Sequence, residues 1–209
     1  MQVNTIRDRI VELSHQSGAD GEVRGKALNW LNAAYLEVLN ELLLLAPHSL
    51  QRTETVTTDS TGHAMLATPP HALVRVLWGA VPLAIVTPLA LLEADPAATV
   101  TGLPNLACVT ATGVQVQPRQ AGSATVVYTP KPSPLAEDGA EASILLPPAF
   151  HDALVWGGLV WSALYERGLG SSAELQLFMR QWAEAKARLK LHLLSLAGLP
   201  LRVAPAGEF

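Results

Sequence analysis

The order of sequence patterns along the chain constrains its fold most strongly. Apolar residues recur every three or four positions in 1–48 and again in 147–197, as they do on the buried face of a helix. Residues 49–146 form short alternating runs broken by Pro and Gly, which is typical of β-strands. We therefore predict an α+β protein. Its N-terminal and C-terminal helix pairs form a helical bundle, an antiparallel β domain with a Pro-rich linker is inserted between them, and residues 198–209 are an extended C-terminal arm.

Start and stop signals support the helical assignments. Pro47 ends the second helix, and Pro147 suits the first turn of the third. Ser171 followed by Glu174 forms a capping box for the fourth helix, and Gly198 is a natural stop after it. These signals place the domain boundaries near residues 48, 146 and 197.

The β segment contains a mixture of clear and ambiguous signals. A Thr-rich strand is predicted at 53–58, and a turn at 59–62 joins it to a hairpin partner at 63–68. One helical turn is predicted at 89–93, whereas the strand topology of 81–105 stays open. A further strand is predicted at 73–78, and half-buried antiparallel strands are predicted at 114–117 and 126–129.

The composition indicates a protein that touches neighbours. Hydrophobic residues make up 49% of the chain and charged residues only 15%, well below the roughly 25% of an ordinary soluble domain. Burial of surface between subunits is one explanation, and the Ala- and Leu-rich composition of a GC-rich genome is another. The net charge of −4 lacks the basic footprint of a dedicated nucleic-acid binder.

The chain carries no sign of a secretory or membrane protein. Its N-terminus lacks the apolar segment of a signal peptide, and the apolar run 42–46 is too short to span a bilayer. The single cysteine, Cys108, lies in an apolar stretch that predicts a buried side chain. We expect a soluble protein made in a cytoplasm, with no membrane partner.

Residues capable of catalysis are present without the spacing that catalysis needs. None of the six histidines lies at a short metal-ligand spacing from another ligand, and His151-Asp152 are neighbours that do not face each other on a helix. Nucleophile-elbow and phosphate-loop motifs are absent. The acidic residues Glu137, Asp138 and Glu141 fit a solvated linker better than a cation site. We expect no enzyme, no cofactor and no metal. The histidines are His15, His48, His63, His71, His151 and His192.

Lys186, Arg188 and Lys190 give the last helix a basic end with two interpretations. They can complement the negative end of the helix dipole. Alternatively, copies arranged in a ring would line a channel with positive charge and contact the DNA backbone without sequence preference. The small size of the cluster favours the dipole.

The arm at 198–209 is too short to build a core of its own. It is either a frayed terminus or an extended peptide that docks on a partner, and its density of apolar anchors favours docking. The expected contact residues are Leu199, Leu201, Arg202, Val203 and Phe209.

Several motifs occur along the chain in a characteristic order, including "N-x-A-Y-x-E-V" at 32–38 and "L-P-x-x-F-H-x-x-L-V" at 146–155. They resemble the motifs of the head–tail adaptors (connectors) of tailed phages, in which the second motif reads "I-P-x-x-Y-H-x-x-L-V". Gene-transfer-agent particles use similar adaptors. The remaining matches are at 68–76, 101–105, 114–118 and 126–135.

This resemblance implies a structural protein of the virion rather than an enzyme. It implies a homo-oligomeric ring of about twelve copies under the portal protein, joining the capsid to the tail and letting double-stranded DNA pass. The β domain would face a tail protein or a stopper or nozzle protein, and the arm would grip the portal. Assembly would take place in the cytoplasm of the bacterial host.

Two other classes remain open from the residues alone. One is a soluble ligand-binding or hydrolytic domain with a site in the β loops, where convergent polar groups are expected. The other is a tail-terminator or tail-tube subunit, which the helical ends disfavour.

Overall fold

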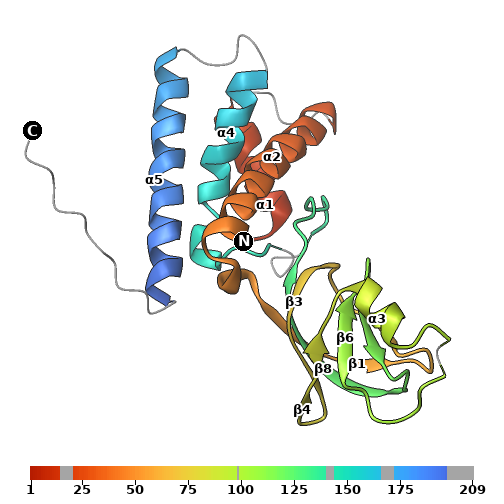
Figure 1. Ribbon diagram of the computed structural model, residues 1–209. Coiled ribbons are helices and arrows are strands. Elements are labelled where there is room, and N and C mark those ends of the chain that lie inside the picture. The colour runs from red at the N-terminus through yellow and green to blue at the C-terminus, as the bar shows by residue number, and fades with distance from the viewer. Residues whose placement is uncertain (15–20, 98, 140–143, 166–171, 197–209) are drawn as a thin grey trace, which may run out of the picture. The chain divides into compact units, whose positions relative to one another are not determined.

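The computed structural model describes residues 1–14, 21–97, 99–139, 144–165 and 172–196 (Figure 1). The chain divides into two compact units. We call Met1–Ser49 with Ser133–Phe209 the helical unit, and Leu50–Pro132 the β-rich unit. The predicted combination of helices and antiparallel-rich sheets is confirmed in the described part of the chain.

The helical unit is built around α4, which contacts each of its other long helices (Figure 1). The helix α4 (Ala153–Tyr165) has no charged residue and buries side chains on several sides. A helix that is apolar all round has to be enclosed by others. The helices around it are α1 (Val3–Leu13), α2 (Gly21–Leu45) and α5 (Ser172–Leu196), and the short 3₁₀ turns are η1 (Pro47–Leu50) and η3 (Pro148–Phe150).

Two adjacent glycines let the neighbouring helices approach α4 closely. A Cβ atom on Gly157 would lie 2.6 Å from the Cβ of Ala34 in α2. A Cβ atom on Gly158 would lie 2.3 Å from the Cδ1 of Ile10 in α1. Both distances are shorter than carbon atoms tolerate. The Ala34 Cβ is fixed to its backbone, so the packing of α2 on α4 requires glycine at 157, whereas at 158 the end of the Ile10 side chain would have to shift.

The segment 133–146 belongs to the helical unit, whereas the sequence had placed it in the β domain. The side chain of Asn32 in α2 donates to the Leu135 carbonyl at 3.1 Å and accepts from the Leu135 amide at 2.7 Å. The Tyr35 hydroxyl accepts from the Leu145 amide at 3.0 Å. The segment lacks a repeating pattern, and side chains of α2 bond to the backbone at Leu135 and Leu145 instead.

The β-rich unit contains two four-stranded sheets. Their strand orders are β1-β8-β3-β4 and β2-β7-β6-β5, and every pair is antiparallel except β5 with β6. The first sheet comprises β1 (Arg52–Thr58), β8 (Gly122–Pro130), β3 (Pro70–Trp78) and β4 (Val81–Pro82). The second comprises β2 (His63–Met65), β7 (Gly113–Gln117), β6 (Leu106–Val109) and β5 (Ala84–Ile85).

The predicted hairpin between 53–58 and 63–68 is wrong beyond its turn. The turn is present, because the Asp59 carboxylate accepts from the amides of Thr61 and His63. The strands then separate, and β1 pairs with β8 while β2 pairs with β7. Long-range partners with better cross-strand packing therefore override the local turn signal. The predicted helical turn is confirmed as α3 (Pro88–Ala94), capped by the Thr87 hydroxyl.

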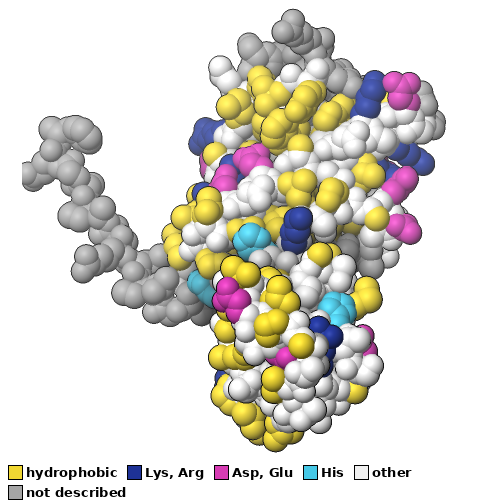
Figure 2. Space-filling model, turned by 45° about the vertical axis from the view of Figure 1, so that its right-hand side comes forward, with side chains coloured by type: hydrophobic (Ala, Val, Ile, Leu, Met, Phe, Trp, Pro, Cys, Tyr) yellow, Lys and Arg dark blue, Asp and Glu magenta, His cyan; other side chains and the backbone are white. Residues whose placement is uncertain are grey.

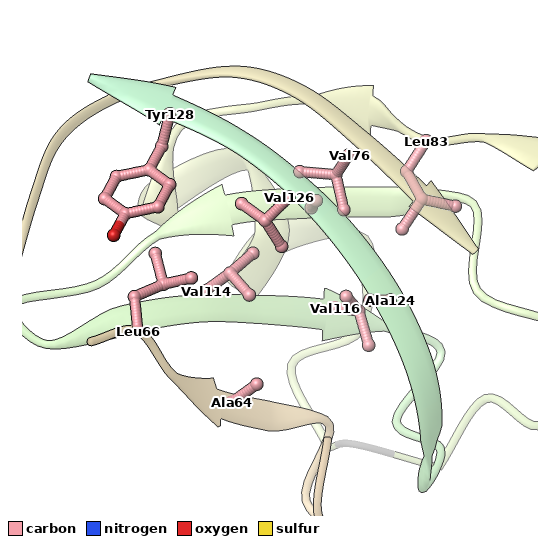
Figure 3. Close-up of a cluster of buried hydrophobic side chains, with 10 residues drawn as sticks. Ala64, Leu66, Val76, Leu83, Val114, Val116, Ala124, Val126 and Tyr128 are labelled. Atoms are coloured by element: carbon pink, nitrogen blue, oxygen red, sulfur yellow. The ribbon is translucent and has the colours of Figure 1, made fainter. Parts of the chain in front are cut away.

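The core of the β-rich unit lies between the inner faces of its sheets (Figure 3). Val76 and Val126 from the first sheet and Val114 and Val116 from the second are fully buried. Tyr128 is also fully buried, and its hydroxyl donates to Glu54. Burial, together with that carboxylate, raises the pKa of Tyr128, so the phenol stays protonated at neutral pH. The predicted strands at 73–78, 114–117 and 126–129 are confirmed.

Candidate functional site

The residues expected at the basic end of the last helix form part of an ion cluster between α5 and α2. The Lys186 ammonium lies 2.6 Å from a Glu37 carboxylate oxygen and 2.8 Å from one of Glu41. Lys190 lies 2.7 Å from the other Glu41 oxygen. The Trp161 indole N–H donates to Glu37 at 3.3 Å, which orients that carboxylate. We call Glu37, Glu41, Lys186 and Lys190 the α2–α5 ion cluster.

The interpretation of these cations as complements of the helix dipole is not supported. The last turn of α5 contains no basic residue, and carboxylates of α2 neutralise Lys186 and Lys190 instead. The sequence held a signal for this pairing that we missed. Glu37 and Glu41 are four residues apart on one helix, as are Lys186 and Lys190 on another, so each pair shares a face.

Burial and charge act in opposite directions in the ion cluster. Burial opposes ionisation of Glu41, but the ammonium groups of Lys186 and Lys190 outweigh it and lower the pKa of Glu41. Burial likewise opposes the charge of Lys186, but Glu37 and Glu41 outweigh it and raise the pKa of Lys186. The cluster is therefore fully charged at neutral pH.

We expect the helical unit to lose stability in acid through Glu41. Its folded pKa is lower than its usual value of 4.5, so its contribution is complete above pH 4.5 and disappears as pH falls through the folded pKa. Fluorescence of Trp182, whose ring lies 5.4 Å from the Lys186 ammonium, should report this loss in an acid titration under mild urea. We expect Glu41→Gln to have a lower free energy of unfolding than wild type at neutral pH and to lose less of it as the pH falls. Equal acid dependence in both proteins would show that Glu41 is not responsible.

Arg188 differs from the two lysines. Its guanidinium lies 3.9 Å from Glu184 on the same helix, and its side chain is 77% exposed. It is therefore the most accessible of the three predicted cations. Contact of Lys186, Arg188 and Lys190 with DNA stays a prediction, and so does the role of Leu199, Leu201, Arg202, Val203 and Phe209, which lie outside the described residues.

Among the residues that the structure describes, the buried histidine is His151. Its Nε2 lies 2.9 Å from the Leu146 carbonyl, and its Nδ1 lies 3.2 Å from the Met1 amino group. Asp152 does not orient His151, because it pairs with Arg9 at 2.6 Å. His15 lies outside the described residues, and no group of three His, Cys, Asp or Glu in the described ranges could hold a metal ion.

The acidic segment is tied to the helices instead of being solvated throughout. The guanidinium of Arg7, a residue only 5% exposed, pairs with Glu137 and, at 2.7 Å, with Asp8. A buried guanidinium requires such partners. Sequence reasoning missed Arg7 because it lies 130 positions from Glu137. Glu141 lies outside the described residues.

The β-rich unit contains a groove of about 710 Å³ between α3 and the second sheet. Leu91, Leu92, Pro88 and Val109 contribute apolar walls, and Gln115 and Gln117 contribute polar side chains. We call it the α3 groove. Its volume is within the range of ligand pockets, so its chemistry has to be considered.

Two reactive groups that line the α3 groove, Cys108 and Asp95, are in states that do not favour catalysis. Burial raises the pKa of the Cys108 thiol, which keeps it in the poorly nucleophilic protonated form. Asp95 accepts from the amides of Thr99 at 2.9 Å and Val100 at 3.1 Å. Burial opposes its ionisation, but these bonds outweigh burial and lower the pKa of Asp95. Its carboxylate is therefore occupied in holding the loop after α3.

The described part of the chain thus combines ion-paired helices, an inserted β-rich unit and a groove with apolar walls. The chain belongs to the SU10 adaptor protein family, whose sequence model matches residues 1–203. This membership is consistent with a phage head–tail adaptor, and such an adaptor is a component of the virion. A search of curated proteins gives no match to the chain. No helix in the described ranges has the length and apolar character needed to cross a membrane.

Proposed function

We propose that the protein is a head–tail adaptor that forms a ring under the portal of a phage-like particle, joins the capsid to the tail and lets DNA pass. The observation that carries this proposal is the family match over residues 1–203. The proposed ring has about twelve copies, and it assembles in the cytoplasm of the bacterial host.

Exposed apolar side chains of the helical unit support association with other subunits. Leu44 is 86% exposed, and Leu177, Met179 and Leu191 on α5 are each half exposed. Exposed apolar side chains within a charge-poor chain are typical of surfaces that a partner covers. Contacts between different faces of successive copies would close such subunits into a ring.

The proposed portal contact is the arm at 198–209, which follows α5 directly. Leu199, Leu201, Val203 and Phe209 would insert as apolar anchors, and Arg202 would pair with an acidic group of the portal. The β-rich unit would face the next tail component, such as a stopper or nozzle protein.

The proposed DNA contact uses the basic residues of α5 and involves no base recognition. Arg188 is the strongest candidate, because its side chain is exposed and its guanidinium lies 3.9 Å from the Glu184 carboxylate. Lys186 and Lys190 could contact DNA only after breaking their ion pairs with Glu37 and Glu41, which costs free energy. Repeated around a ring, even one exposed cation per copy lines the channel with positive charge.

We expect deletion of residues 198–209 to abolish portal binding while leaving the fold intact. The test mixes the full-length or truncated protein with the portal of the same particle and measures bound mass by native mass spectrometry and cryo-EM. A matched variant that keeps the length but replaces Leu199, Leu201, Val203 and Phe209 with serine should also fail to bind.

Unchanged binding by both variants would exclude the arm as the portal contact. Failure of the full-length protein to bind the portal would contradict the adaptor function itself. The latter result would favour a ligand-binding protein, for which the α3 groove is the place to screen.

A further inference from the structure

The β-rich unit has an unusually uncharged surface segment. Residues 76–92 are seventeen consecutive residues without a charged side chain, although they include β4, β5 and most of α3. The whole unit of 83 residues has only four basic and four acidic residues. Water-facing strands and turns usually carry charges, which also protect sheet edges from association. An uncharged segment of this length therefore suggests a covered surface.

The uncharged segment is exposed at the hairpin that joins β3 to β4. Val81 is 57% exposed, and Gly79, Ala80 and Pro82 around it are exposed as well. We call Trp78–Pro82 the β3–β4 hairpin. In Figure 1 it forms one end of the β-rich unit, and Figure 2 shows hydrophobic side chains gathered at that end. Apolar surface of this kind is usually buried by a partner.

This hairpin is held in one shape before any partner binds. Trp78 pairs with Val81, and the two-residue turn between them has Gly79 at φ 58°, which tight hairpin turns need. The Trp78 ring packs over Gly122, where a Cβ atom would lie 2.5 Å from the ring. A preformed hairpin loses little conformational entropy on binding, which favours it as the inserted element of an interface.

The α3 groove has the properties needed to receive such a hairpin. Leu92 on its rim is 59% exposed, and Leu91, Pro88 and Val109 give it apolar walls. The side-chain amides that line it are already engaged within the unit, because Gln115 donates to the Thr61 carbonyl at 2.6 Å and Gln117 bonds to Asp95. Asp95 accepts from the Thr99 and Val100 amides and interacts with Arg119, which also lines the groove, so its charge is compensated within the unit. The groove thus matches an apolar, uncharged hairpin.

The β3–β4 hairpin cannot fill the groove of its own copy. Figure 1 shows α3 and β4 at separate places in the β-rich unit, and the unit's own pairing holds β4 against β3. A hairpin and a groove on different faces of one chain form a head-to-tail contact, which repeats from copy to copy and can close a ring.

We propose that the β3–β4 hairpin of one copy inserts into the α3 groove of a second copy. This inference deepens the proposed function, because it names the surfaces by which ring subunits join. Val81 is the central apolar contact of the hairpin, and Leu92 is its counterpart on the groove. The contact lies in the β-rich unit and is independent of the arm at 198–209.

The test uses two single variants of the full chain, Val81→Asp and Leu92→Asp. Each places an unpaired carboxylate in the contact, so we expect each to weaken self-association by at least about a hundredfold. Met65→Asp is the matched control, because Met65 is 70% exposed in the same unit but belongs to neither surface. Sedimentation and native mass spectrometry at the highest soluble concentration measure the oligomers.

Mixing the two variants distinguishes a head-to-tail contact from other interfaces. Val81→Asp keeps an intact groove and Leu92→Asp keeps an intact hairpin, so one wild-type contact remains between them. We expect a one-to-one dimer in the mixture and no larger species, whereas either variant alone stays monomeric. Circular dichroism should show that both variants are folded.

Two results would overturn this proposal. One is wild-type self-association in both variants, and the other is a wild-type chain that stays monomeric at every concentration. Binding of wild type to the portal, measured separately, tests the adaptor function. If wild type binds the portal but both variants oligomerise as wild type does, the proposed function stands and this interface is excluded.

Discussion

Replacing Gly157 with alanine is expected to lower the free energy of unfolding of the helical unit by about 2 kcal/mol. The added Cβ would lie 2.6 Å from the Cβ of Ala34 and 3.0 Å from the Trp182 ring. Ala34 has no side-chain torsion that could relieve the clash, so α2 and α4 must move apart. This cost outweighs the roughly 1 kcal/mol that alanine gains over glycine inside a helix.

Gly25 in α2 supplies the matched control, since a Cβ there meets nothing within 4 Å. Gly25→Ala should therefore raise the free energy of unfolding by about 0.5–1 kcal/mol. Ala34→Gly should partly rescue Gly157→Ala by removing the nearest atom. Urea unfolding followed by tryptophan fluorescence measures these differences, because four of the five tryptophans belong to the helical unit. Stabilisation by Gly157→Ala would show that α2 and α4 are not in close contact.

Reversing the charge at residue 186, Lys186→Glu, is expected to lower the free energy of unfolding by about 2–3 kcal/mol. The new carboxylate would face Glu37 and Glu41, whose side chains are about a third exposed, so water screens only part of the repulsion. The substitution also removes the Lys186 ammonium, so the negative charges of the partly buried Glu37 and Glu41 are less neutralised. The helix α5 should then detach from α2 more readily.

The charge-swapped double variant Lys186→Glu with Glu37→Lys should recover at least half of that loss, because an opposite pair is restored. Arg180→Glu on the same helix is the control. Its partner Glu184 and Arg180 itself are solvent-exposed, so reversal there should cost no more than about 1 kcal/mol. A double-mutant cycle from urea unfolding gives the coupling energy. A coupling near zero would mean that the α2–α5 ion cluster does not hold α5.

The kinds of element could be predicted from the sequence because their signals are local. Pro88 and Pro96 bound the predicted turn that forms α3, and the alternation at 114–117 and 126–129 marks strands β7 and β8. The adaptor family could also be recognised, because its motifs depend on residue order alone. Partners could not be predicted in the same way. The turn at 59–62 correctly predicted a reversal of the chain but wrongly predicted the pairing of the strands on either side.

The sequence by itself determined the mixed class, the order of helices and strands and the scarcity of charge, because periodicity and composition do not depend on distant residues. The tertiary structure decided that Asn32 holds Leu135, that Arg7 pairs with Glu137, and that Lys186 pairs with Glu37. Each of these contacts joins residues more than 100 positions apart. Such pairs form only where helix packing brings buried polar groups together and removes water, so burial determines their energy.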